Sequence, residues 1–177
     1  MQLHFENAAL HKDQVNRLFL SAFPKDERPP VSLLYRRHRQ KKAKFHAVMD
    51  GDVFVGLALL TGTESVQTLM FLAVEEKHRG KGYGSEILRR VKEEYKNVSF
   101  FLCAEPLDEK AENARERENR LQFYAHNGFH EIGMMVREAG VDYTVLTPGQ
   151  PLTYAQYKEC VLAFFGWLRF HLIINRF

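Results

Sequence analysis

The chain has 177 residues, of which 45% are hydrophobic and 27% are charged, and its formal net charge is +3. This length suits one domain with a substantial core, and the composition excludes a low-complexity or solenoid-repeat protein. The small positive charge is compatible with an anionic ligand but too weak to indicate a nucleic-acid partner.

The cysteines and the hydropathy of the chain indicate its compartment. The only two cysteines, Cys103 and Cys160, do not suggest a disulfide framework and fit a reducing compartment. The N-terminal segment lacks the apolar core of a signal peptide, and no uninterrupted apolar run reaches the roughly 18 residues of a spanning helix. We therefore expect a cytoplasmic protein with no membrane partner. Without an HExxH motif or a Cys/His cluster, no metal is expected.

The N-terminal part predicts a strand followed by two helices. Alternating apolar residues at Leu3 and Phe5 predict a short strand, and apolar residues at helical spacing then predict a helix that ends at Pro24. The segment FPKDERPP is a loop, and Pro30 suits the first turn of a second helix through VSLLYRRHRQ. The basic run YRRHRQKKAK reads as a solvated helix end, and a patch for an anionic partner is the alternative.

The middle of the chain predicts a hairpin, a strand, a helix and a buried strand. Two β-rich runs flank Asp50-Gly51, which is a strong hairpin signal, and VQTLMFLAV predicts a further strand. Apolar residues from Ile87 to Tyr95 fall on one helical face. The run VSFFLCAE is almost continuously apolar, as in parallel strands that are covered on both faces.

The remaining segments complete an α/β or α+β pattern. A polar-then-apolar helix is expected to end at Asn127-Gly128, and two strands are expected around Ala139-Gly140. The order is then β, α, α, β-hairpin, β, α, β, α, β, β, which predicts a single mixed sheet with helices on its faces.

The C-terminal tail is a separate feature. From Val161 to Ile174 it is apolar nearly all round, with Arg169 and His171 as interruptions. A helix of this kind must be buried, either against the sheet or at an oligomer interface such as that of a homodimer. We therefore divide the chain into a domain over residues 1–150 and an apolar helical extension over residues 151–177.

The glycine-rich turn RGKGYG, residues 79–84, lies between a strand and a helix. Backbone N–H groups at a helix start have no internal partner, the helix dipole favours an anion there, and glycine lets a phosphate approach. The Walker pattern is absent, and Ser85 stands where the third glycine of a dinucleotide motif belongs. A purely structural turn is the alternative.

Two motifs together resemble the GNAT N-acetyltransferases. The first is Arg79-x-x-Gly82-x-Gly84 after a strand, and the second is FYAHNGF, Phe123 to Phe129, about forty residues later. The resemblance covers roughly Phe45 to Thr147. It implies a mostly antiparallel sheet with a central splayed parallel pair and helices on both faces. It also implies that acetyl-CoA is the cosubstrate and that an amine attacks it directly in a ternary complex.

The resemblance assigns roles to individual residues. Tyr124 matches the tyrosine that commonly protonates the leaving thiolate, and a core aromatic is the alternative. Family members often carry an asparagine seven residues earlier, where this chain has Arg117. The turn would hold the pyrophosphate of coenzyme A and the preceding strand its pantetheine arm. This cofactor-binding set comprises Leu72, Ala73, Val74, Arg79, Gly80, Lys81, Gly82, Tyr83, Gly84 and Ser85.

Two carboxylates are candidates for the general base that takes the proton of the amine. Glu105 ends the predicted parallel strand, where open α/β sheets place ligands. Glu27 lies in the loop that often lines the acceptor site of the family. Each reads equally well as a surface carboxylate. The acceptor, a small-molecule or peptide amine, is not identified by the sequence. The alternative function is a non-catalytic module that binds or senses acyl-CoA, and a basic nucleic-acid-binding protein is a weaker third.

Overall fold

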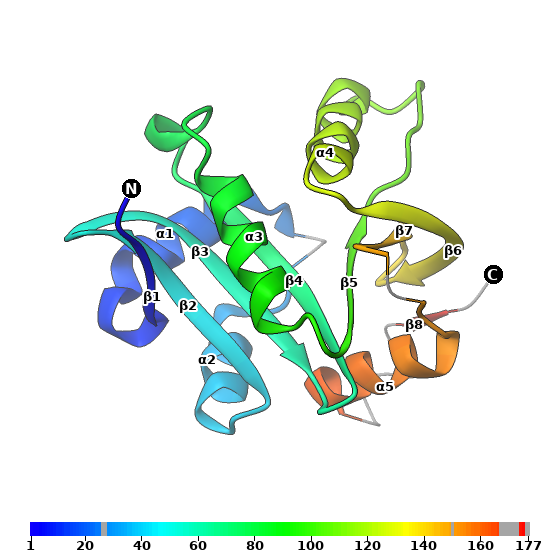
Figure 1. Ribbon diagram of the computed structural model, residues 1–177, viewed down its shortest axis with the longest axis horizontal. Coiled ribbons are helices and arrows are strands. Elements are labelled where there is room, and N and C mark those ends of the chain that lie inside the picture. The colour runs from blue at the N-terminus through cyan, green and yellow to red at the C-terminus, as the bar shows by residue number, and fades with distance from the viewer. Residues whose placement is uncertain (26–27, 150, 167–173, 176–177) are drawn as a thin grey trace.

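The chain folds around one mixed sheet. The structure is a computed structural model that describes residues 1–25, 28–149, 151–166 and 174–175. The strands lie in the order β1-β2-β3-β4-β5-β7-β6-β8 (Figure 1). They are β1 Leu3–Asn7, β2 Ala43–Asp50, β3 Val53–Gly62, β4 Val66–Val74, β5 Ser99–Ala104, β6 His130–Glu138, β7 Val141–Thr147 and β8 Ile174–Asn175. Among these described strands only β4 and β5 pair in parallel.

Helices cover both faces of the sheet, as the sequence predicts. They are α1 Lys12–Ala22, α2 Val31–Arg39, α3 Tyr83–Glu94, α4 Ala114–His126 and α5 Tyr154–Phe165, with short 3₁₀ turns η1 Ala8–His11 and η3 Glu76–His78. One core joins α1, α2 and α5 to the sheet, and a second joins α3 and part of α4 to the opposite face. In Figure 1 α3 crosses in front of the sheet while α1 and α2 lie behind it. No helix among the described residues is long and apolar enough to cross a membrane.

The parallel pair is splayed, as expected from the resemblance. Register between β4 and β5 holds only from Val66↔Ser99 to Thr68↔Phe101. Beyond that point β5 pairs with β7 instead, from Leu102↔Leu146 to Ala104↔Thr144. The second half of β4 therefore has no strand partner on its β5 side.

A β-bulge lies where β4 leaves β5. Pairing with β3 moves from Leu60↔Leu69 to Leu59↔Phe71, so Met70 is the extra residue. A bulge bends its strand and leaves the extra residue without a ladder partner. This bend accounts for the separation of the two strands.

The C-terminal segment differs in part from the predicted helix over residues 161–174. Helix α5 begins earlier, at Tyr154, behind a capping box made by Thr153 and Gln156, and it ends at Phe165 before Gly166 (φ 78°). It packs on the sheet, where the Cys160 thiol bonds to the Thr61 carbonyl at 3.3 Å. Ile174 belongs to strand β8 and not to a helix. Arg169 and His171 lie outside the described residues.

Candidate functional site

The glycine-rich turn has the backbone that its sequence predicts. Gly80 (φ 72°) and Gly82 (φ 83°) both lie in the left-handed region, and a Cβ on either would meet nothing within 4 Å. Their conformation therefore requires glycine, and the space beside them is open. The Arg79 guanidinium donates through Nε to the Val74 carbonyl at 3.2 Å, which fixes the turn to the end of β4.

The start of α3 presents unpaired backbone donors. Gly82 is its N-cap and supplies no capping side chain. Along α3, the first backbone N–H with an acceptor in the helix is that of Glu86, which donates to the Gly82 carbonyl at 3.0 Å. The N–H groups of Tyr83, Gly84 and Ser85 precede it and have no acceptor within the helix. Together with the helix dipole they form a site suited to an anion.

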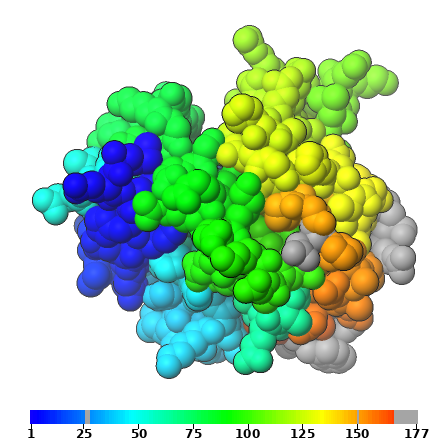
Figure 2. Space-filling model, in the orientation of Figure 1, coloured from blue at the N-terminus to red at the C-terminus, as the bar shows by residue number. Residues whose placement is uncertain are grey.

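An open groove of about 650 Å³ adjoins this helix start. It runs between α3 and the end of α4, where Figure 2 shows a notch between the green and the yellow surfaces. Three of its lining residues carry basic side chains, Arg89, Lys92 and His126. The Lys92 ammonium also donates to the Asn127 carbonyl at 2.6 Å and so joins α3 to the end of α4.

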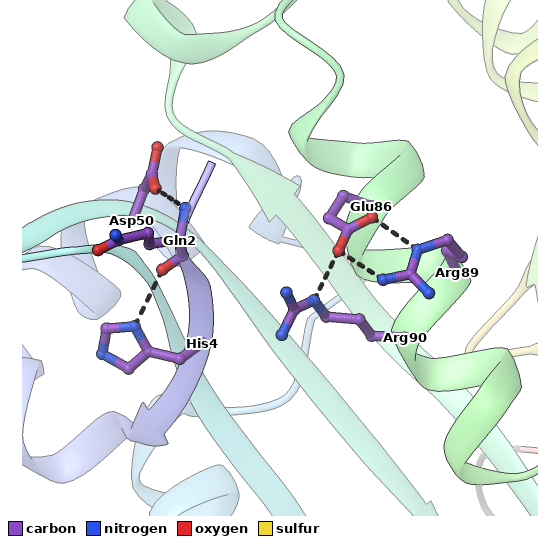
Figure 3. A network of polar contacts seen from close by, with 6 residues as sticks. All are labelled: Gln2, His4, Asp50, Glu86, Arg89 and Arg90. Carbon is purple, nitrogen blue, oxygen red and sulfur yellow. Dashed lines mark hydrogen bonds and ion pairs between the residues drawn. The ribbon is translucent and has the colours of Figure 1, made fainter.

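Two carboxylates beside the groove are already engaged, as Figure 3 shows for Asp50 and Glu86. Glu86 accepts hydrogen bonds from Arg89 and Arg90, which hold its pKa down at about 2. Asp50 accepts from the Gln2 N–H and from the Tyr83 hydroxyl, the latter at 2.7 Å. The side chain of Tyr83 is thus committed to the β2–β3 hairpin, which leaves its backbone N–H as the group that faces a ligand.

Tyr124 lies on α4 against the second core. Its ring contacts those of Phe123 and Phe129, with centroids 5.4 and 6.1 Å away. Its hydroxyl makes no hydrogen bond to any residue that the structure describes. Burial raises the pKa of this phenol, the positive charge of Arg120 partly lowers it, and the nearby Cys103 thiol acts on it as well. Tyr124 therefore lies beside the half of β5 that has separated from β4, with a protonated hydroxyl at neutral pH.

Glu105 is held in a clamp between β5 and α4. Its carboxylate is 2.6 Å from Nη2 of Arg117 and 3.1 Å from Nη1 of Arg120, and Asn113 adds a bond of 3.3 Å. The residue is 3% exposed. Arg120 lies four residues after Glu116, a spacing that allows an ion pair on the helix surface, but it binds Glu105 instead. The carboxylate of Glu105 is therefore engaged in a buried ion-pair network.

A sequence comparison identifies the family of this chain. A family model described as an acetyltransferase (GNAT) domain matches residues 41–131, which is just over half of the chain. The chain belongs to the GNAT acetyltransferase family. Membership supports acyltransferase activity, and the matched range contains both sequence motifs, the splayed strand pair and Tyr124. No curated protein sequence matches the chain significantly.

Solved structures share the GNAT fold at low sequence identity. A GNAT-family acetyltransferase from Bacteroides thetaiotaomicron superposes with a TM-score of 0.72 at 15% identity, over 89% of this chain and 92% of that one. An aminoglycoside 6'-N-acetyltransferase complexed with coenzyme A gives 0.65 at 17%, over 86% and 100%. Naa50 from Arabidopsis thaliana, in complex with the bisubstrate analogue CoA-Ac-MVNAL, gives 0.60 at 15%, over 86% and 100%. These likenesses establish the fold.

The GNAT fold brings most of the predicted site residues together. Leu72, Ala73 and Val74 form the end of β4, and the turn from Arg79 to Ser85 follows directly. Lys81 is exposed in that turn. Glu105 is present at the end of β5 but is bound to arginines, and Glu27 lies outside the described residues. Among the described residues no three His, Cys, Asp or Glu side chains converge as a metal site would require.

Residues that the sequence reasoning did not select also belong to this region. Phe123 precedes Tyr124 and packs on Gly84, and Arg89 and Lys92 line the groove. The sequence did contain a signal for Arg89 and Lys92. They follow Glu86 by three and six residues, so they lie near one face of the helix that starts at the glycine-rich turn. The pairing of Tyr83 with Asp50 had no such signal, since it joins residues 33 positions apart.

Proposed function

We propose that this GNAT protein transfers the acetyl group of acetyl-CoA to a primary amine by direct attack in a ternary complex. The observation that carries the proposal is the position of the splay between β4 and β5. It opens between a helix start with unpaired N–H groups on one side and the Tyr124 phenol on the other. A thioester in that position would have its phosphates at the helix start and its sulfur toward Tyr124.

The donor half of the site fits coenzyme A. The open space beside Gly80 and Gly82 admits a pyrophosphate to the N–H groups of α3. The groove next to it adds the cationic side chains of Arg89 and Lys92, a suitable surface for the remaining phosphate of the cosubstrate. The unpaired edge of β4 offers backbone donors and acceptors to the amide groups of the pantetheine arm.

The residues near the splay favour direct transfer over a covalent enzyme intermediate. The Cys103 thiol is the nearby nucleophile, but burial raises its pKa well above the usual value, and the negative charge of Glu138 adds to the effect. A thiol that stays protonated is a weak nucleophile. Tyr124 is protonated at neutral pH and can donate to the departing thiolate.

The acceptor is proposed only as a primary amine of a small molecule or peptide. The names of two neighbours in the fold, an aminoglycoside acetyltransferase and a protein bound to an acetylated peptide analogue, show that the fold serves both classes. A cytoplasmic location is proposed from the two cysteines, both of which are free thiols. The alternative function remains an acyl-CoA sensor without turnover.

Binding of coenzyme A is the first test of this function. A ligand at 100 times its Kd stabilises a protein by about 2.7 kcal/mol, which appears as a rise in Tm. Coenzyme A should therefore raise the Tm at near-physiological ionic strength. No rise would contradict both the enzyme and the sensor.

Turnover separates the enzyme from the sensor. Acetyl transfer should be measured with a panel of primary amines for the native protein and for Tyr124→Phe. Loss of a general acid costs about 10²–10⁴-fold in rate, whereas coenzyme A should raise the Tm of both proteins equally. A protein that binds coenzyme A and acetylates no amine would be a sensor. Equal rates for both proteins would remove Tyr124 as the acid.

A further inference from the structure

Glu138, at the end of β6, is a polar residue on the sheet face that α5 covers, opposite the face on which Tyr124 packs. Val136 and Glu138 lie two residues apart and so share one face of the strand. Val136 is fully buried in the core that contains α1, α2 and α5. Glu138 follows Val136 on this core-facing side and is therefore an exception to its apolar pattern. It has no part in the protonation of the leaving thiolate by Tyr124.

Glu138 is held in place by a residue of α5. The hydroxyl of Tyr157 donates to Oε1 of Glu138 at 2.5 Å. Tyr157 is fully buried, and its ring lies 5.8 Å from that of Phe101 on β5. The next residue of β5 on this face is Cys103, whose thiol interacts electrostatically with Glu138. The carboxylate thus interacts with the part of β5 that has separated from β4.

The two oxygens of this carboxylate differ in their hydrogen bonding within the described residues. Oε1 is taken by Tyr157, whereas Oε2 accepts no hydrogen bond from the part of the chain that the structure describes. The neighbouring Arg137 does not neutralise Glu138, because Arg137 forms its ion pair with Asp142. In contrast to Glu105, Glu138 has no cationic partner among the described residues.

The side chains around this carboxylate are apolar or aromatic. Met134 lies on the same face of β6 as Val136 and Glu138, Tyr143 pairs with Val136 across β6 and β7, and Tyr154 stacks on Tyr157 with ring centroids 5.8 Å apart. Met70 is the bulge residue of β4, so it lies where the two strands part. An amine that approached Glu138 would therefore place its carbon skeleton against thioether and aromatic groups.

We propose that Glu138, positioned by Tyr157, binds the ammonium group of the acceptor and takes its proton, and that the acceptor is a monoamine with an apolar or aromatic body. This inference rests on the proposed function and deepens it. Tyr124 and Glu138 then serve opposite faces of β5, with the donor on one side and the acceptor on the other.

The proton balance of the reaction assigns one role to each group. The acceptor ammonium gives one proton to Glu138, which passes it to solvent. The free amine forms a C–N bond with the acetyl carbon, and the C–S bond then breaks. Tyr124 protonates the departing sulfur, and the second N–H proton released from nitrogen restores the phenol. The products are an acetamide, coenzyme A as a thiol and one proton in solvent.

The surroundings of Glu138 make its carboxylate more basic than an ordinary one. Burial raises its pKa above the ordinary 4.5, and the hydrogen bond from Tyr157 partly opposes that rise. The titratable groups that face it are the phenol of Tyr157 and the thiols of Cys103 and Cys160, each with a pKa raised by burial. All three stay neutral while the carboxylate titrates. Tyr154 interacts with Tyr157 in the same cluster.

The test uses phenethylamine as the probe, with spermidine as the polycationic comparison. Glu138→Gln keeps an oxygen for Tyr157 but cannot take a proton. We expect kcat/KM for phenethylamine to fall about 100-fold or more. We also expect the acidic limb of its pH profile to disappear and the rise in Tm with coenzyme A to stay unchanged. Glu131→Gln, on the same strand, is the matched control and should keep the native profile.

Tyr157→Phe tests the positioning role separately. Removal of the donated hydrogen bond should raise the pKa of Glu138 further, so the acidic limb should move to higher pH and not vanish. An unchanged limb would overturn the positioning role of Tyr157. Loss of folding in this variant would leave Glu138→Gln as the deciding measurement.

The outcomes separate this inference from the proposed function. Calorimetric binding of phenethylamine to the coenzyme A complex should be lost in Glu138→Gln. Transfer to spermidine but not to phenethylamine would overturn the monoamine assignment and leave the proposed function standing. Native kcat/KM and pH profile in Glu138→Gln would overturn the role of Glu138. Coenzyme A binding without transfer to any amine would overturn the proposed function itself.

Discussion

The ring of Phe123 occupies the space that a side chain on Gly84 would need. A Cβ on residue 84 would lie only 2.9 Å from Cζ of Phe123. This contact joins the first turn of α3 to α4 one residue before Tyr124. It ties the helix start that would bind phosphate to the helix that carries the proposed acid.

Gly84→Ala should therefore disturb the donor site. Overpacking costs about 1–3 kcal/mol, while alanine gains about 1 kcal/mol over glycine inside a helix. We expect a small net loss of stability and a clear loss of coenzyme A affinity, because the Phe123 ring must move. Thermal unfolding and calorimetry with coenzyme A measure the two effects.

Phe123→Leu provides the control for this contact. In that background Gly84→Ala should no longer cost affinity, since the ring that it meets is gone. Equal losses of coenzyme A affinity in the native and Phe123→Leu backgrounds would show that the contact between residue 84 and Phe123 plays no part in binding.

Gly82→Ala should destabilise the turn through its backbone. The residue has φ 83° and open space around its Cβ, so the cost is conformational and not a clash. A left-handed alanine costs about 1–2 kcal/mol, which lowers the Tm by a few degrees and weakens coenzyme A binding. Asparagine tolerates this conformation better, so Gly82→Asn should be milder in both measurements. The reverse order would contradict the explanation.

Glu105→Gln should behave as the loss of a structural clamp. Its removal leaves Arg117 and Arg120 without their shared carboxylate, at a cost of about 3 kcal/mol for a buried ion pair. We expect a marked fall in Tm, and an acidic limb of the pH–rate profile at its native position in the fraction that stays folded. The exposed Glu118→Gln is the control on α4. A native Tm with loss of that limb would instead identify Glu105 as the base.

The N-terminal strand should respond to pH through Glu6. Its carboxylate accepts from His11 at 2.6 Å and from His4 at 2.9 Å, which lowers the pKa of Glu6 below 4.5 and raises that of His4 above 6.5. The contribution of Glu6 is lost as pH falls through its lowered pKa, and that of His4 is lost as pH rises through its raised pKa. The interaction should therefore be complete between about pH 4.5 and 6.5.

An NMR titration of the His4 ring measures this effect directly. The midpoint should lie above 6.5 in the native protein and fall in Glu6→Gln, which removes the negative charge. A midpoint that does not respond to this substitution would contradict the pairing.

The local features of this protein follow from short stretches of sequence. The Asp50-Gly51 hairpin, the helix stop at Asn127-Gly128 and the face of α3 from Ile87 to Tyr95 all depend on neighbours within a few residues. Turn conformations and helical spacing are set at that range, so their sequence patterns are sufficient. The GNAT motifs are also local, and for that reason the conformation of the glycine-rich turn was predictable.

The partners of the carboxylates depended on the tertiary structure. Glu105 meets Arg117 and Arg120 because α4 folds back over the end of β5, and Glu138 of β6 meets Tyr157 because α5 packs against the sheet. Neither pairing leaves a periodic trace in the sequence, since each joins elements whose approach is fixed by the packing of the whole sheet. The sequence by itself therefore determined the order of elements and the donor turn. Only the tertiary structure decided which carboxylate is bound to arginines and which lacks a cationic partner among the described residues, because the partners of a charge depend on what is folded against it.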